Sequence, residues 1–401
     1  MKKNFMLHIL AAFILAIIAG IIFGERATVV QPLGDLFLRL IKFIIVPLIL
    51  STIVVGVTSA GSMKKLGSLG GKAIGYFLLT SFIAIALGLF AGFVFQPGAG
   101  VDLAVQGDAV EAPETEGVIA TLLNIIPTNP VEALTTGAVL QIIFFAIFLG
   151  VGISLVGEKA LPVQRFFEGL AEVMYKITGI VMKIVPLGIF GLLAPIVGTY
   201  GPSVLMPLIK VIIAMVVAVI VHVALVYSAA VKTFGKMNPY DFFKGIFPAA
   251  SVAFATCSSS GTLPVTMKNT QENLGVSKET SSFVLPLGAT INMDGTAIYQ
   301  GIAVMFIAQY FGVELTMAQI LIVALMGTLA SIGAAGVPGA GLIMLTMVLT
   351  AVNLPLEGIA LIAGIDRLLD MLRTSVNIIG DASACVVVEG GKTGSAIKRG
   401  A

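Results

Sequence analysis

The chain has 401 residues, of which 58% are hydrophobic and 11% are charged, and its mean hydropathy is +1.06. Soluble domains carry about 25% charged residues, so this composition excludes an ordinary soluble domain and predicts a protein that crosses a membrane several times. The net charge of +2 is too small to indicate nucleic-acid binding. Cys257 and Cys385 lie far apart in sequence, which predicts neither a disulfide framework nor a CxxC metal site.

Six apolar stretches in the first part of the chain predict helices, since a helix needs about 20 apolar residues to cross a bilayer. They span 7–23, 33–57, 73–94, 118–156, 166–197 and 204–230. We interpret the first as a spanning helix rather than a signal peptide, because no small-residue cleavage pattern ends it convincingly. The fourth is too long for one straight helix and contains PTNP at 127–130, so we expect shorter helices there.

The loop at 97–117 contains five acidic residues and neither Lys nor Arg, which predicts an exposed, poorly ordered external loop. The basic residues gather instead at the N-terminus and in alternate loops: Lys2, Lys3, Lys64, Lys65, Lys72, Lys159, Arg165, Lys232, Lys236 and Lys244. By the positive-inside rule, the N-terminus lies in the cytoplasm. We therefore expect a multi-pass protein of the cell (plasma) membrane.

Two later apolar segments are interrupted at their centres by small residues and proline. The first, at 247–269, contains SSSGTLP, and the second, at 321–349, contains GVPGAG. Each arm is too short to span a bilayer alone, which predicts two re-entrant hairpins. A helix with an embedded polar motif follows each hairpin, and this repeated design is typical of the binding site of a transporter.

The polar motif after the second hairpin is a stripe of side chains at 364–381, GIDRLLDMLRTSVNIIGD. At about 100° per residue on a helix, one face carries all six members of the stripe: Asp366, Asp370, Arg373, Thr374, Asn377 and Asp381. Each charge facing lipid would cost about 2.5–3.5 kcal/mol. The stripe therefore predicts a binding site that faces protein, water or ligand.

The motif after the first hairpin, NMDGT at 292–296, has the chemistry of a cation site. An unwound turn at 292–295 would free backbone carbonyls beside the Asp294 carboxylate, and hard cations prefer oxygen ligands. Side chains elsewhere could add further oxygen ligands: Thr80, Ser81, Asn377 and Asp381. The alternatives are that NMDGT is a kinked helix whose Asp294 is satisfied by a neighbour, and that Thr80 and Ser81 only pack helices.

The stripe also offers the three complements that an acidic amino acid needs. Asp370 can pair with an ammonium group, Asn377 and the backbone amides of 258–260 can hold one carboxylate, and Arg373 can hold a second carboxylate bidentately. The alternative is that Arg373 is neutralised by Asp366 or Asp370 as an internal ion pair.

Two other classes of protein are less favoured. An enzyme is disfavoured because GxSxG is absent, and because His8 and His222 lie in separate apolar segments without evident pairing. We interpret both histidines as helix-packing residues. The C-terminal GGKTG is not a phosphate loop, because Val386 occupies the required first glycine position. A channel remains an alternative, since polar stripes also line pores.

The motifs SSSGTLP, NMDGT, GVPGAG and DxxxDxxRTxxNxxGD together resemble the dicarboxylate/amino acid:cation symporter family over essentially the whole chain. The resemblance implies an all-α membrane protein with inverted repeats, a homotrimer in the lipid bilayer. Each protomer would have eight transmembrane helices and two re-entrant helical hairpins. A transport domain, 71–96 and 201–401, would move like an elevator against a static scaffold, 1–70 and 118–200, with 97–117 as an external acidic loop.

The resemblance also implies roles for individual residues. Arg373 and Thr296 would hold the substrate side-chain carboxylate, Asp370 and Thr374 the amino group, and Asn377 and Ser259 the α-carboxylate, with Ser258 beside them and the tip from Val337 to Gly341 closing as a gate. One sodium ion would use Gly288, Asn292, Asn377 and Asp381. A second would use backbone at Thr290, Met293, Ser331, Ile332 and Ala334, and a third Phe77, Thr80, Ser81, Asn292 and Asp294.

The same comparison favours sodium, because proton-coupled bacterial relatives usually replace the NMDGT and serine-rich patterns. This chain has Cys257 and Met371 at the two positions where many sodium-coupled members place an extra arginine, which alters the electrostatics around Asp370. We expect a sodium-coupled symporter of L-aspartate before L-glutamate, with Na+ co-transported, no organic cofactor and no enzymatic activity. The alternative is a proton-coupled glutamate or C4-dicarboxylate symporter of the same family.

Overall fold

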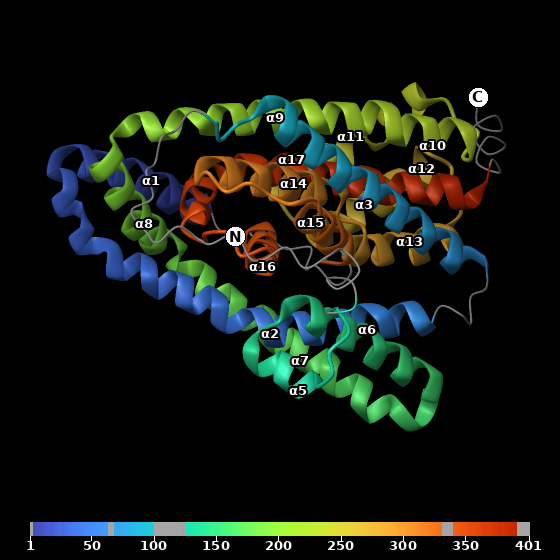
Figure 1. The fold of residues 1–401 in the computed structure, drawn as a ribbon. Coiled ribbons are helices and arrows are strands. Elements are labelled where there is room, and N and C mark those ends of the chain that lie inside the picture. The colour runs from blue at the N-terminus through green and yellow to red at the C-terminus, as the bar shows by residue number, and fades with distance from the viewer. Residues whose placement is uncertain (1–2, 63–67, 100–122, 124, 331–339, 391–401) are drawn as a thin grey trace.

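The computed structural model describes residues 3–62, 68–99, 123, 125–330 and 340–390 (Figure 1). Every regular element within these ranges is a helix, as expected for an all-α protein. Five of the helical stretches are long and apolar enough to cross a membrane: Ala11–Leu40, Leu69–Phe95, Gln141–Val181, Met206–Thr233 and Gly358–Glu389. Most of the predicted external loop lies outside the described residues, as do four predicted site residues: Ser331, Ile332, Ala334 and Val337.

The first three predicted helices are present and extend a few residues beyond their apolar runs. Helix α1 (Lys3–Phe23) continues through the 3-10 turn η1 (Gly24–Val30) into α2 (Gln31–Ser62), and α3 (Ser68–Phe95) follows. The predicted interruption of the fourth run is confirmed by α5 (Pro130–Thr136) and α6 (Val139–Val156). The Asn129 side chain caps α5 by accepting from the Val131 and Glu132 amides, and Pro130 occupies the first helical position, where its missing N–H is harmless.

The fifth and sixth predicted runs are each divided. After η3 (Gly157–Ala160), the fifth consists of α7 (Leu161–Val181), η4 (Met182–Ile184) and α8 (Val185–Tyr200). Pro186 causes the division, because it lacks the N–H that would continue α7. The sixth consists of η5 (Pro202–Leu205), α9 (Met206–Val221), the π-helical turn η6 (His222–Tyr227) and α10 (Ser228–Thr233). Nothing in the apolar pattern predicted this wider turn.

The C-terminal half contains two helix pairs at the positions where the sequence predicts hairpins. The first pair is α11 (Pro239–Thr256) and α12 (Ser259–Glu272), joined at Cys257 and Ser258. The arms of the second are α15 (Met317–Ala330) and α16 (Ala340–Ala351). Between the pairs lie α13 (Lys278–Ile291) and α14 (Asp294–Tyr310), and the chain closes with the long helix α17 (Gly358–Glu389).

The helices form two groups that meet along α17 and α16 (Figure 1). In one group, α2 packs along α6, α7 and α8, while α1 packs along α8. In the other group, α3 lies along α14, and α17 contacts α11, α13 and α14. All of the described candidate site residues belong to the second group.

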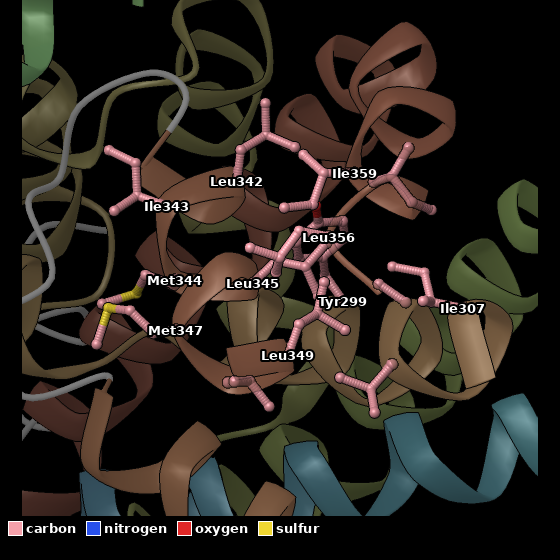
Figure 2. Packing of buried hydrophobic residues seen from close by; sticks show 14 of the residues in the cluster. Tyr299, Ile307, Leu342, Ile343, Met344, Leu345, Met347, Leu349, Leu356 and Ile359 are labelled. Carbon is pink, nitrogen blue, oxygen red and sulfur yellow. The ribbon is translucent and has the colours of Figure 1, made fainter. Parts of the chain in front are cut away.

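Buried apolar side chains pack α16 against α14 and α17. Figure 2 shows Leu342, Leu345 and Leu349 of α16 gathered near Tyr299 of α14 and Ile359 of α17. All are buried, so this apolar cluster fixes α16 against the helices that carry polar side chains.

Close contact between α3 and α14 depends on glycine. A Cβ at Gly88 would collide with the Ile298 carbonyl, and one at Gly301 would lie 2.5 Å from the Leu89 amide nitrogen. The two backbones can therefore approach closely, as small residues allow in membrane helices. This approach brings the polar pair on α3, Thr80 and Ser81, beside the start of α14.

We predict that Gly88→Ala destabilises the protein although alanine is the better helix former. The added Cβ meets a carbonyl that cannot move freely, and overpacking costs about 1–3 kcal/mol, more than the gain in helix propensity of about 1 kcal/mol. The midpoint of thermal unfolding in detergent should fall below that of the wild type. Gly75→Ala is the matched control on α3, because no described atom outside its own stretch of helix lies within 4 Å of its added Cβ; equal midpoints for the two variants would contradict the prediction.

Candidate functional site

The site is built where α17 crosses the break between α13 and α14. Three glycines allow this crossing. A Cβ at Gly295 would collide with the backbone carbonyl of Arg373. A Cβ at Gly288 would collide with the Asp381 carboxylate, and a Cβ at Gly380 would collide with the side-chain amide of Asn292. The polar face of α17 therefore lies directly against the broken backbone.

The predicted unwound turn is confirmed for its first two residues. Asn292 is extended at φ −90° and ψ 99°, Met293 lies at φ −124° and ψ 46°, and α14 begins at Asp294. The backbone freed by the break bonds to α17, because the Gly295 amide donates to Asn377 Oδ1 at 2.8 Å. Polar backbone in an apolar interior needs such partners, so α17 stabilises the break.

A second set of hydrogen bonds at the break gathers oxygen atoms. The side-chain Nδ2 of Asn292 donates to Asp381 Oδ1 at 2.9 Å and to the backbone carbonyl of Asn377 at 3.0 Å. The side-chain Nδ2 of Asn377 lies 3.1 Å from Met293 Sδ. Asn292 Oδ1 is buried and receives no hydrogen bond from any described residue. A buried amide oxygen of this kind beside a carboxylate suits a cation with oxygen ligands.

Asp294 is fully buried and accepts hydrogen bonds from two other helical segments. Ser81 Oγ on α3 donates to Asp294 Oδ1 at 2.7 Å. On the other side, Tyr227 donates its hydroxyl to Oδ2 at 2.8 Å, and His222 Nε2 lies 3.2 Å from the same atom. The interpretation of His222 as an unpaired helix-packing residue is therefore wrong.

Neither Tyr227 nor His222 was predicted as a neighbour of Asp294. The only sequence signal is their spacing of five residues inside an apolar run. On an α-helix that spacing places two side chains about 140° apart, and a π-helical turn reduces the separation. The signal is too weak to use without the tertiary structure.

Arg373 is buried between two carboxylates of its own helix. Its Nη1 donates to Asp366 Oδ1 at 2.8 Å, and its Nη2 lies 3.1 Å from Asp370 Oδ1, an ion pair without hydrogen-bond alignment. The guanidinium carbon lies 4.2 Å from the centre of the Tyr299 ring, a cation–π contact. The internal ion pair that the sequence left open is thus present, and it involves both aspartates.

The surroundings of Arg373 include further predicted site residues. A Cβ at Gly341 would lie 2.6 Å from the guanidinium carbon, so the start of α16 rests on Arg373. Thr374 Oγ1 lies 3.4 Å from Asp370 Oδ1, where it can donate a hydrogen bond. Among the described residues, α14, α16 and α17 therefore enclose the guanidinium, while the predicted gate residue Val337 lies outside them.

The first hairpin lies against the other edge of α17. Arg367 Nη2 donates to the Ala255 carbonyl at 3.2 Å, and the Ser375 hydroxyl donates to the Ala250 carbonyl at 3.2 Å. Ser258 caps α12, because its Oγ accepts from the Gly261 amide at 3.0 Å. The amino end of α12, with Ser259 in its first turn, is therefore held near the stripe by α11.

The predicted site residues differ in what they contact. Those brought together around the break are Ser81, Gly288, Asn292, Met293, Asp294, Asn377 and Asp381, and Phe77 lies close to them, since its ring is 3.1 Å from a Cβ placed at Gly288. Thr80 and Thr290 donate to carbonyls in their own helices, those of Phe77 and Leu287. Thr296 is buried in the first turn of α14.

Known proteins of one family are similar to this chain over nearly its whole length. The model of the sodium:dicarboxylate symporter family matches residues 5–390. The chain is 41% identical over 392 residues to a proton/sodium-glutamate symport protein of Geobacillus stearothermophilus, covering 95% of this chain and 93% of that protein.

Two relatives from Bacillus subtilis (strain 168) carry different names. A proton/glutamate-aspartate symporter is 38% identical over 394 residues, covering 97% of this chain and 95% of that protein. A C4-dicarboxylate transport protein is 35% identical over 393 residues, covering 96% and 93%. Because the family match covers nearly the whole chain and includes the stripe and the break, this protein belongs to the sodium:dicarboxylate symporter family.

Proposed function

We propose that the chain is a sodium-coupled secondary active symporter of acidic amino acids, L-aspartate before L-glutamate, in the cell membrane. The observation that carries this proposal is the buried guanidinium of Arg373, paired with Asp366 and Asp370 one helical turn from the oxygen cluster at the break. A single helix, α17, contributes to both centres.

The substrate class follows from the charges around Arg373. A buried guanidinium binds carboxylates bidentately, and a substrate carboxylate would replace one of its two aspartate partners. An aspartate released in this way would no longer be paired with the guanidinium, and it could accept a hydrogen bond from the ammonium group of an amino acid. Asp370 is the better candidate, because its contact with Arg373 is the longer of the two, at 3.1 Å against 2.8 Å. Thr374 and Asn377 lie one turn further along the same face.

The need for a co-transported cation follows from the formal charge of the region. Four buried carboxylates, on Asp294, Asp366, Asp370 and Asp381, face one guanidinium, which leaves a formal charge of −3. An acidic amino acid adds a further negative charge. Burying that much uncompensated charge is costly, which favours the entry of cations together with the substrate.

Na+ suits the break better than H+ does. Asn292 Oδ1 is a neutral oxygen that can ligate a metal cation but does not take up a proton at neutral pH. We assign one cation to Gly288, Asn292, Asn377 and Asp381, and another to the Asp294 side of α14 with Phe77, Thr80, Ser81 and Asn292. Both assignments rest on the clustering of these residues and on the family.

The mechanism we propose is an elevator movement in a homotrimer. The two helix groups support it, because α1, α2 and α6–α8 would form the scaffold while α3 and α9–α17 would carry substrate and cations together. The whole described site lies in the second group, so it can move as one unit. The N-terminus would lie in the cytoplasm.

The alternative within the family is coupling to protons, or transport of C4-dicarboxylates. The names of the relatives support this alternative, because they include proton/sodium-glutamate, proton/glutamate-aspartate and C4-dicarboxylate carriers. A C4-dicarboxylate lacks the ammonium group that we assign to Asp370. Competition by such a substrate therefore tests the amino-group assignment.

The deciding experiment is uptake of radiolabelled L-aspartate into proteoliposomes of the purified protein. An inward Na+ gradient is compared with equal K+ and choline gradients at two external pH values. Uptake that requires Na+ and ignores a proton gradient supports the proposal. Uptake driven by protons alone contradicts sodium coupling, and equal competition by a C4-dicarboxylate contradicts the choice of amino acids.

We predict that Arg373→Ala weakens L-aspartate binding by at least about 30-fold, because removing one partner of a buried charge pair costs about 2–5 kcal/mol. Calorimetry at saturating Na+ measures the affinity. Arg367→Ala is the matched control on α17, since its guanidinium bonds only to the Ala255 carbonyl among the described contacts and should change the affinity little. Unchanged binding by the Arg373 variant would remove this residue from the substrate site.

We predict that Asp381→Asn and Asp294→Asn each raise the Na+ concentration for half-maximal uptake by at least about tenfold, since even indirect partners of metal ligands have effects of that size. The measurement is a Na+ titration of uptake. Asp241→Asn, at an exposed position in the first turn of α11, is the control. A Na+ dependence that neither buried substitution alters would show that the cations bind elsewhere.

A further inference from the structure

The π-helical turn η6 lies where the chain passes Asp294. His222 begins the turn and Tyr227 ends it, and both side chains are fully buried. Their rings lie 4.8 Å apart at 81°, edge to face. A regular α-helix would separate these two side chains by about 140°. The π-helical turn instead directs both toward one carboxylate.

The two side chains meet Asp294 at a single oxygen atom. Tyr227 donates to Oδ2 at 2.8 Å, and His222 Nε2 lies 3.2 Å from Oδ2, while only Ser81 bonds to Oδ1 among the described residues. Because a carboxylate only accepts, the His222 ring donates from Nε2, and its Nδ1 bonds to no residue that the structure describes. Oδ2 therefore accepts from both residues of the π-helical turn, and Oδ1 accepts from α3.

The space for the Tyr227 hydroxyl is provided by α17. A Cβ at Gly380 would lie 2.5 Å from this hydroxyl, so only glycine leaves room for it. The same hydroxyl lies 3.3 Å from the Val376 carbonyl. The hydroxyl is therefore enclosed by α14 and α17 and has a fixed direction.

We propose that His222 and Tyr227 are positioning residues for cation binding, which hold Asp294 Oδ2 so that Oδ1, together with Ser81, is presented to the ion. This inference rests on the proposed function. Groups that bond to the far side of a metal ligand fix its orientation and are often as important as the ligands themselves. When an ion binds, the Ser81 hydroxyl turns its lone pairs toward it, while the two bonds to Oδ2 remain.

The test compares Tyr227→Phe with Tyr310→Phe in proteoliposomes of the full-length protein. Tyr310 is a matched control, since it is equally buried, lies on α14 itself and has a hydroxyl that bonds to none of the described residues. Tyr227→Phe should raise the Na+ concentration for half-maximal L-aspartate uptake by about tenfold or more. At saturating Na+ its L-aspartate affinity should stay within about twofold of the wild type, and Tyr310→Phe should change neither value.

A second pair of variants removes and restores the other donor. His222→Leu should shift the Na+ dependence in the same direction as Tyr227→Phe. His222→Gln should recover most of the loss, because the glutamine amide nitrogen can donate from near the position of Nε2. This rescue would not occur if the ring only filled space.

The outcomes separate the two proposals. If the wild type takes up aspartate without Na+, the proposed function fails. If the wild type needs Na+ but Tyr227→Phe and His222→Leu match Tyr310→Phe in their Na+ dependence, the positioning role is overturned and the proposed function stands. A lower unfolding temperature with an unaltered Na+ dependence would also overturn it, because the two residues would then be structural only.

Discussion

The bonds between α17 and the break at Asn292 and Met293 are the constraint on which the rest of the site depends. A helix that stops inside an apolar protein exposes backbone groups with no water to bond to them. Here the Asn377 side chain accepts from the Gly295 amide, and the Asn292 side chain bonds back to α17. The break is stable because α17 supplies hydrogen-bond partners for its polar groups. The polar face of α17 is tolerated because it contacts the break rather than lipid.

This mutual dependence places the substrate candidates and the cation candidates on one rigid element. Arg373, Asn377 and Asp381 follow one another at intervals of four residues, so each lies about one helical turn, or roughly 6 Å along the axis, from the next. Asn377 occupies the middle position and bonds to both the backbone and Met293 of the break. Arg373 and Asp381 are both buried, so their charges interact over a short distance with little screening by solvent. This separation is the physical basis of the coupling that we propose between substrate and cation binding.

The carboxylates of the region are tolerated because each has an ion-pair or hydrogen-bond partner, on α17 itself or on a neighbouring segment. Asp366 and Asp370 share Arg373, Asp381 accepts from Asn292, and Asp294 accepts from α3 and from the π-helical turn. A buried charge without partners would be excluded by its desolvation cost. Glycines at the crossings bring these partners close, since any side chain there would separate the backbones.

By itself, the sequence determined the helical class, the polar stripe on α17, the interruption at PTNP and the broken helix at NMDGT, because periodicity, proline and glycine act locally. It could not decide whether Arg373 was paired with one aspartate, with both or with none. Nor could it show that His222 and Tyr227 reach Asp294, which lies 72 and 67 residues away in sequence. Those choices depend on how closely distant helices pack and on one π-helical turn, and only the tertiary structure sets both.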